Sequence, residues 1–334
     1  MKTGEDKLVQ RVAKAVATKS SKSLALGVGD DAALLKVRPD FEIILTCDWS
    51  LEGSHFLLGK HPADSIGWKC LARAISDVAA MGGQPRCFLL SLALPDSAAL
   101  KDSGRGSRWL DGFLSGLRRA ARRFKCELAG GDTTQSSHIL ISVTVVGEVP
   151  AGRAIGRSGA KAGDKVFVSG TLGEAELGLR ELRAGRRISP KHDSAMRKHL
   201  YPEPRLALGQ WLAERKLASS MMDISDGLSS DLLRLCAASR VGARIEATKI
   251  PLPSLSAGGS KKPYDALTLA LHGGDDYELL FTVSMKNAGR IPRSFQGLAL
   301  TQIGEITRQP GILLVQKDGV SKRLLPGGWD PFRK

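Results

Sequence analysis

Residues 273–283 read Gly-Gly-Asp-Asp-Tyr-Glu-Leu-Leu-Phe-Thr-Val, an acidic glycine turn followed directly by an apolar run. Glycine permits the backbone conformations of a tight turn, and the short apolar run predicts a buried strand over 279–283. A second stretch, Asp223-Ile-Ser-Asp-Gly, has the same character and leads into a predicted helix over 228–239. Acidic turns joined to apolar elements are therefore a recurring unit of this chain.

Working outward from these stretches, two halves alternate strands with helices. A linker rich in glycine, alanine, arginine and serine separates them at 149–163. The chain length of 334 residues suits two hydrophobic cores. We therefore expect an α/β (α+β) fold with two domains, residues 1–150 and residues 151–334. The predicted strands are 43–45, 88–92, 139–146, 165–169, 243–246 and 279–283, and the predicted helices are 62–81, 107–124, 204–216 and 228–239.

Composition narrows the class of protein without deciding the function. Lys and Arg number 49 against 34 Asp and Glu, which gives a formal net charge of +15. Such a charge attracts anions, so nucleic acid, nucleotides and phosphorylated metabolites are all candidates. The five cysteines form no C-x-x-C pair, and no apolar run reaches the length of a membrane span. The start of the sequence lacks the pattern of a secretory signal, so we expect a cytoplasmic protein without membrane contact.

The carboxylates are concentrated in six short segments beside glycine, serine or threonine. One such segment is an ordinary turn in many proteins, but six of them suggest a shared purpose. Mg²⁺ prefers a few carboxylate and hydroxyl oxygens together with substrate phosphates. Carboxylates that converge without cations repel one another, so we expect bound metal and phosphate. The segments are residues 29–31, 46–48, 76–77, 130–134, 223–227 and 273–276.

Several familiar motifs are absent or incomplete. Residues 27–32 match G-x-G-x-x-A, but two aspartates in the loop would repel a pyrophosphate, and 33–37 is too short for the required helix. There is no P-loop and no protein-kinase signature. The calcium-loop-like start at Asp223 lacks its terminal glutamate, since Leu233 and Arg234 stand there.

Taken together, these strings resemble the thiamine-monophosphate kinase family over nearly the whole chain. The resemblance implies a two-domain fold like that of aminoimidazole ribonucleotide synthetase, with the N-terminal sheet at the interface of a homodimer. It also implies ATP and several Mg²⁺ ions as requirements, thiamine monophosphate (TMP) as substrate and thiamine diphosphate as product. The strings are GVGDDAALL (27–35), TCDWSLEGSHF (46–56), SDVAAMGGQP (76–85), GGDTT (130–134), GRSGAKAGD (156–164), DISDGLSSDL (223–232) and GGDDYELLFTV (273–283).

The resemblance assigns roles position by position. The expected metal ligands are Asp30, Asp31, Thr46, Cys47, Asp48, Asp77, Asp132, Asp223 and Asp226. The nucleotide-binding positions are Gly131, Asp132, Arg157 and Ser225, the TMP-binding positions are His55, Asp275 and Trp329, and Asp132 with Asp223 are the catalytic pair.

Three positions depart from the family pattern. Cys47 replaces a hydroxyl, so its metal contact would come from the backbone; Ala74 replaces an Asn; and Asp275 replaces a Glu, one methylene longer.

For this reaction we expect direct, in-line phosphoryl transfer without a phosphoenzyme, since the acceptor phosphate is already nucleophilic. Two alternatives remain at this stage. One is another enzyme of the same superfamily, such as a purine-pathway ligase, a selenophosphate synthetase or a hydrogenase-maturation factor. The other is a basic nucleic-acid-binding protein, which the net charge favours. Aromatic residues make up only 5% and form no binding module, so we expect no nucleic-acid partner.

Overall fold

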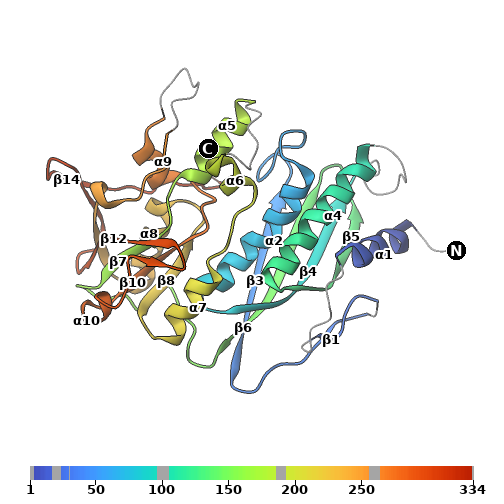
Figure 1. The fold of residues 1–334 in the computed structure, drawn as a ribbon, viewed down its shortest axis with the longest axis horizontal. Helices are drawn as coiled ribbons and strands as arrows, with labels where there is room; N and C mark the ends of the chain where they lie inside the picture. Colours follow the sequence, from blue (N-terminus) through green and yellow to red (C-terminus); the bar gives the residue numbers. More distant parts are fainter. Residues whose placement is uncertain are drawn as a thin grey trace. The chain divides into compact units, whose positions relative to one another are not determined.

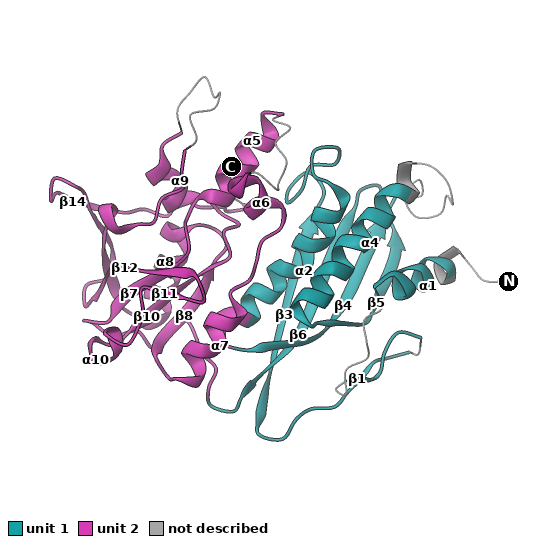
Figure 2. Cartoon of the chain, viewed as in Figure 1, with its two compact units in different colours: residues 1–78, 83–152 teal, residues 79–82, 153–334 magenta. Residues whose placement is uncertain are grey.

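The computed structural model describes residues 4–16, 24–29, 31–95, 105–185, 193–255 and 264–332. Contacts between Cα atoms divide the chain into two compact units, coloured separately in Figure 2. Unit 1 comprises Met1–Val78 and Gly83–Gly152, and unit 2 comprises Ala79–Gly82 and Arg153–Lys334. No helix among the described residues is long and apolar enough to cross a bilayer.

Unit 1 is built on a four-stranded sheet in the order β3-β6-β4-β5. The pair β4 and β5 is parallel, and the other two pairs are antiparallel. Two helices, α2 (Ala63–Ala80) and α4 (Arg105–Phe124), cover one face of this sheet (Figure 1). Their close packing depends on glycine, since a Cβ on Gly116 would lie 1.8 Å from the Asp64 carbonyl oxygen. The strands are β3 (Phe41–Leu51), β4 (Gln84–Leu94), β5 (Glu127–Gln135) and β6 (Leu140–Pro150).

The other face of the sheet is only partly covered. The antiparallel pair β1 (Leu24–Leu26) and β2 (Leu34–Leu35) lines a cavity with strands β4 and β5. Helix α1 (Gly4–Val16), which contacts α4 and the edge strand β5, also lines this cavity. Apolar side chains elsewhere on this face stay exposed, including Leu45 on β3, which is 71% exposed.

Two of the expected acidic turns are strands instead. The Gly-Gly-Asp-Thr-Thr stretch at 130–134 lies within β5, and Thr46 to Asp48 lie within β3, which continues to Leu51. The glycines that suggested a turn serve a close strand contact, because a Cβ on Gly131 would lie 1.9 Å from the Leu90 carbonyl oxygen. Within a strand, successive side chains point to opposite faces, so this correction determines which acids share a face.

Unit 2 contains an eight-stranded sheet, whose path runs β14-β13-β9-β12-β7-β10-β8 with β11 paired to β12. Strand β10 (Glu278–Val283) is buried along its whole length, as its apolar run predicts. Leu280 belongs to one hydrophobic core and Phe281 to another, so the sheet has a core on each face. The other strands are β7 (Lys165–Ser169), β8 (Ala218–Ile224), β9 (Gly242–Glu246), β11 (Ser294–Phe295), β12 (Leu298–Thr307), β13 (Gly311–Val315) and β14 (Ser321–Arg323).

The helices of unit 2 include two that the sequence predicted. Helix α7 (Leu206–Glu214) lies within the expected 204–216, and α8 (Leu228–Ser239) has the expected bounds. The sequence pattern did not predict α5 (Glu174–Arg183), α6 (Ser194–Leu200), α9 (Ala266–His272), α10 (Met285–Ala288) or the 3₁₀ turn η1 (Ala247–Lys249).

Candidate functional site

On the helix-covered face of unit 1, three of the predicted metal ligands come from two elements. Thr46 and Asp48 alternate along β3, and the Thr46 hydroxyl donates a hydrogen bond to the Asp77 carboxylate on α2. Arg73, one turn before Asp77, lies 3.8 Å from the Asp48 carboxylate. The sheet and the helix therefore bring hard oxygen donors together beside one compensating cation.

Cys47 lies between Thr46 and Asp48 but has its side chain on the opposite face. Its Sγ is 3.3 Å from the Ser142 hydroxyl on the neighbouring strand β6. Only the backbone of Cys47 could therefore share a site with Thr46 and Asp48. A thiol is also a soft ligand that Mg²⁺ does not favour.

A cavity of about 990 Å³ in unit 1 collects a second group of predicted residues. Asp31, Gly131 and Asp132 line it, and no lysine or arginine is among the described lining residues. Thr133 also lines the cavity, and its buried hydroxyl finds no hydrogen-bond partner within the described part of the chain. The cavity thus offers two carboxylates to a bound molecule.

The donor set in unit 1 fits Mg²⁺ in kind. All the side chains concerned, apart from Cys47, offer carboxylate or hydroxyl oxygens, which Mg²⁺ prefers. Among the described residues no group of three or more His, Cys, Asp or Glu side chains is close enough to hold an ion. Asp30 lies outside the described residues.

In unit 2, the short segment 224–226 accepts backbone hydrogen bonds from two other segments, one around Asp275 and one at Trp329. Its three successive carbonyl groups each accept one backbone hydrogen bond from a segment that carries a predicted TMP-binding residue. Asp223, which is 3% exposed, is the last residue but one of β8 and comes immediately before this segment. The donors are Tyr277 N to Ile224 O (2.9 Å), Asp275 N to Ser225 O (2.8 Å) and Trp329 N to Asp226 O (2.9 Å).

The backbone N–H groups of residues 225–227, which overlap this segment, all donate hydrogen bonds to Asp231. One carboxylate oxygen of Asp231 accepts from the N–H of Ser225, Asp226 and Gly227 at 3.0 to 3.1 Å. Burial and the neighbouring Asp226 raise the pKa of Asp231 to about 6, although Arg234 and the amides act against this. Arg234 also forms an ion pair with both Asp226 and Asp231. The loop between β8 and α8 is therefore fixed by a carboxylate within the helix.

Asp275 lies in a loop with an unusual backbone. Asp275 and Tyr277 both have positive φ, 66° and 51°, although neither is glycine. Such conformations persist when the surroundings over-determine them. The Tyr277 hydroxyl donates to the Asp275 carboxylate at 2.7 Å, and Nδ1 of the buried His199 lies 4.0 Å from the same group.

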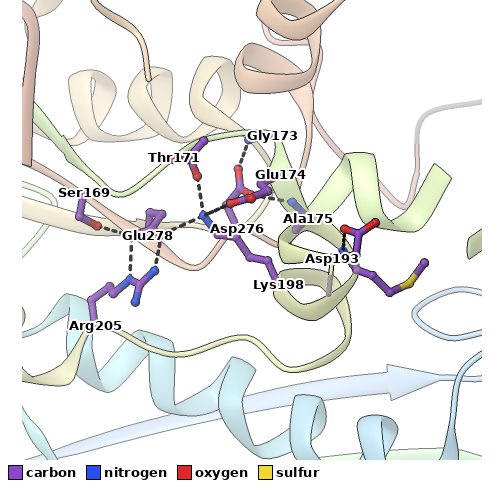
Figure 3. Close-up of polar contacts among 11 residues, drawn as sticks. Ser169, Thr171, Gly173, Glu174, Ala175, Asp193, Lys198, Arg205, Asp276 and Glu278 are labelled. Atoms are coloured by element: carbon purple, nitrogen blue, oxygen red, sulfur yellow. Dashed lines mark hydrogen bonds and ion pairs between the residues drawn. The ribbon is translucent and has the colours of Figure 1, made fainter. Parts of the chain in front are cut away.

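Asp276 and Glu278 anchor this loop through the buried network in Figure 3. Asp276 accepts from the N–H of Gly173 and of Ala175 at the start of α5. Burial raises the pKa of Asp276 to about 6, although Lys198 opposes the shift. Glu278 accepts two hydrogen bonds from the Arg205 guanidinium and forms an ion pair with Lys198 at 2.9 Å. Two buried acids and two cations thus hold the loop that presents Asp275.

His55 and Arg157 are two further predicted residues. His55 follows β3, and its Nδ1 accepts a hydrogen bond from the N–H of Leu51, so the neutral ring carries its proton on Nε2. Arg157 is exposed, and its carbonyl accepts from Ser239 at the C-terminal end of α8. Ser225 lies just before the N-terminal end of α8. The hydrogen bond to Ser239 therefore places the Arg157 backbone at the opposite end of this helix from Ser225.

Comparison with known proteins gives the family. The AIR synthase related protein family matches with its N-terminal domain at residues 29–149 and its C-terminal domain at residues 161–316. The thiamine-monophosphate kinase of Escherichia coli K12 is 37% identical over 336 residues, which cover 99% of each chain. The chain belongs to the thiamine-monophosphate kinase family. The resemblance inferred from the motifs and the enzyme class that it implied are therefore confirmed at the level of the family.

Two solved structures of thiamine-monophosphate kinases share the fold. The enzyme of Stenotrophomonas maltophilia K279a matches with a TM-score of 0.78 at 34% identity, over 94% of this chain and 96% of that one. AaThiL complexed with AMPPCP and TMP matches with a TM-score of 0.74 at 33% identity, over 99% of each chain. The expected fold, two domains like those of aminoimidazole ribonucleotide synthetase, is thus confirmed.

Two residues that the structure places beside the predicted site residues, Thr133 and Asp231, were not predicted from the sequence. Thr133 stood in the quoted GGDTT string and Asp231 in DISDGLSSDL, but neither was assigned a role. An aspartate inside a predicted helix is normally read as a solvated charge. Only the fold of α8 back onto the preceding loop reveals that Asp231 is fully buried against three amides.

Proposed function

We propose that this protein transfers the γ-phosphate of ATP to the phosphate of TMP, which yields thiamine diphosphate and ADP. Membership of the thiamine-monophosphate kinase family supports the reaction class. The complex of AaThiL with AMPPCP and TMP, at 33% identity, supports both substrates. Mg²⁺ is proposed as the cofactor because the candidate ligands are hard oxygen donors.

The observation that carries the proposal is the acid-lined cavity of unit 1. A nucleotide triphosphate is an anion, yet Asp31 and Asp132 line the cavity without a lysine or arginine among the described lining residues. Anionic phosphates would be repelled there unless divalent cations came between them and the carboxylates.

In the proposed reaction, a phosphate oxygen of TMP attacks the γ-phosphorus and the bond to the β,γ-bridging oxygen breaks, so that ADP leaves with that electron pair. When bound, Mg²⁺ supplies charge neutralisation for the two approaching phosphates. Asp132 and Asp223 would hold Mg²⁺ and so orient the phosphates, and Ser225 and Arg157 would contact the nucleotide. His55, Asp275 and Trp329 bind TMP. No strong general base is required, because the acceptor oxygen is already ionised at neutral pH.

A direct assay tests this function. We expect the purified protein to convert TMP and ATP into thiamine diphosphate and ADP when Mg²⁺ is present, and to lose this activity when EDTA removes the metal. Chromatographic detection of thiamine diphosphate provides the measurement, and re-addition of Mg²⁺ is the control. ADP formation that does not depend on TMP would contradict the proposed acceptor.

We propose a homodimer formed through the open face of the sheet in unit 1. Ile43, Leu45 and Trp49 on β3 are 39%, 71% and 53% exposed, and Leu89 on β4 is 39% exposed. The strand register places all four on one face of the sheet, with β6 between β3 and β4. Patches of this kind on a soluble protein mark interaction surfaces, and a twofold dimer would cover the same patch on both copies.

A charge placed in this patch should separate the dimer. We expect Leu45→Glu to convert the protein to a monomer, because two buried carboxylates would face each other across the twofold axis. Light scattering coupled to size-exclusion chromatography measures the mass. Leu313→Glu, on β13 of unit 2 and 43% exposed, is the matched control and should leave the mass unchanged. A dimer that survives Leu45→Glu would place the interface elsewhere.

A further inference from the structure

The segment that carries Trp329 is held in place by the beginning of α8. Residues 324–330 belong to no helix or strand, so their position depends on individual hydrogen bonds. Three successive amides of this segment donate to α8 or to the loop before it. The bonds run from Gly327 N to Ser229 Oγ (3.2 Å), from Gly328 N to Ser230 Oγ (3.2 Å) and from Trp329 N to Asp226 O (2.9 Å).

The packing around these hydrogen bonds leaves no space for a side chain. A Cβ on Gly328 would lie 2.0 Å from the Asp226 carbonyl oxygen, and a Cβ on Gly327 would lie 2.5 Å from Nδ1 of His272. Ser229 is fully buried and Ser230 is 7% exposed. Water therefore cannot readily replace either serine hydroxyl as the acceptor for these amides.

The loop before α8, to which the Trp329 segment binds, is itself fixed by hydrogen bonds. Asp231 follows Ser230 directly and fixes the amides of residues 225–227, so the turn that binds the segment cannot shift easily. The Trp329 side chain remains 47% exposed beside this fixed backbone. The backbone at Trp329 is thus held by hydrogen bonds, while the indole remains accessible to a ligand.

We propose that Ser229 and Ser230 are positioning residues for TMP binding, because they hold Trp329 against the loop that contains Asp226. This proposal rests on the proposed function, in which Trp329 contacts TMP. Neither serine touches the substrate; both act through the backbone of the two glycines. Loss of their hydroxyls frees the segment and weakens TMP binding without changing the nucleotide cavity of unit 1.

Steady-state kinetics of the double variant Ser229→Ala/Ser230→Ala tests the proposal. We expect its KM for TMP to rise about tenfold, the effect of one to two net hydrogen bonds, while its KM for ATP stays within about twofold. Ser230→Thr retains a hydroxyl and should restore a near-normal KM when compared with Ser230→Ala. Ser321→Ala, at an exposed position on β14, is the control and should change neither constant.

Acrylamide quenching of Trp329 fluorescence provides a readout that does not depend on activity. The difference between each protein and its Trp329→Phe counterpart isolates this residue among the five tryptophans. We expect Trp329 to be quenched more strongly in the double-alanine variant. Unchanged quenching together with an unchanged KM for TMP would overturn the proposal. If the wild-type protein forms no thiamine diphosphate, the proposed function fails, and quenching alone then decides whether the serines hold Trp329.

Discussion

Asp132→Asn should reduce the rate of thiamine diphosphate formation by at least about 100-fold at saturating ATP and TMP. Asp132 lies on β5 and lines the acid-lined cavity of unit 1 together with Asp31. Asparagine keeps the shape but removes the negative charge that a Mg²⁺ ion needs. Loss of metal-mediated charge stabilisation costs several kcal/mol in the transition state, and each 1.36 kcal/mol changes the rate about tenfold.

The variant should remain folded, since Asp132 is exposed on its strand. Circular dichroism and the thermal midpoint check this directly. Asp111→Asn, another exposed acid of unit 1, with a side chain 63% exposed and paired with Arg11, is the matched control and should keep normal turnover. Turnover of Asp132→Asn near the wild-type rate across a Mg²⁺ titration would remove this residue from the metal site.

Glu278→Gln should lower the free energy of unfolding of unit 2 by about 3 to 5 kcal/mol, the cost of breaking a buried ion pair. The Glu278 carboxylate is fully buried between Arg205 and Lys198, whose side chains are 24% and 12% exposed. Its removal leaves two cations in a poorly solvated position (Figure 3). Urea unfolding followed by circular dichroism provides the measurement.

An exposed ion pair supplies the control for this change. Glu305 pairs with Lys165 at 2.9 Å but remains 43% exposed, so Glu305→Gln should cost no more than about 1 kcal/mol. Equal effects of the two substitutions would show that the buried network does not stabilise the fold as proposed.

The buried network also predicts an acid dependence of stability. Burial opposes ionisation of Glu278, but Lys198 and Arg205 outweigh it and lower the pKa from 4.5 to about 2. A carboxyl group with a lowered pKa stabilises the fold above pH 4.5 and loses that contribution as pH falls towards 2. The unfolding free energy of the wild type should therefore fall more steeply over this range than that of Glu278→Gln. Asp276 acts in the opposite sense, because its pKa of about 6 favours the fold as it becomes protonated.

Local sequence patterns were sufficient where a single periodicity decided the structure. The strand β10 and the helix α8 were predicted closely because apolar runs and helical spacing act over short distances. The family also followed from the sequence, since several rare strings occurred in one order. The predicted metal, nucleotide and TMP assignments came with that resemblance and remain proposals.

The prediction of a turn was wrong where glycine lies within a strand. Residues 130–134 have the composition of a turn, yet they pair in parallel with β4 because glycine at 131 lets two backbones approach closely. A glycine in the sequence indicates only that the position needs an uncommon backbone conformation or lies too close to another group for a side chain. Whether a turn or a tight strand contact results depends on a partner distant in the sequence.

The sequence by itself determined the family, the order of the main elements and the acidic character of the candidate site. Only the tertiary structure decided which of these side chains share a face, which carboxylates are structural rather than exposed to ligands, and that α8 holds the Trp329 segment. The physical reason is distance along the chain. A hydrogen bond joins Ser230 to Gly328, 98 residues away, and no local pattern encodes a contact of that range.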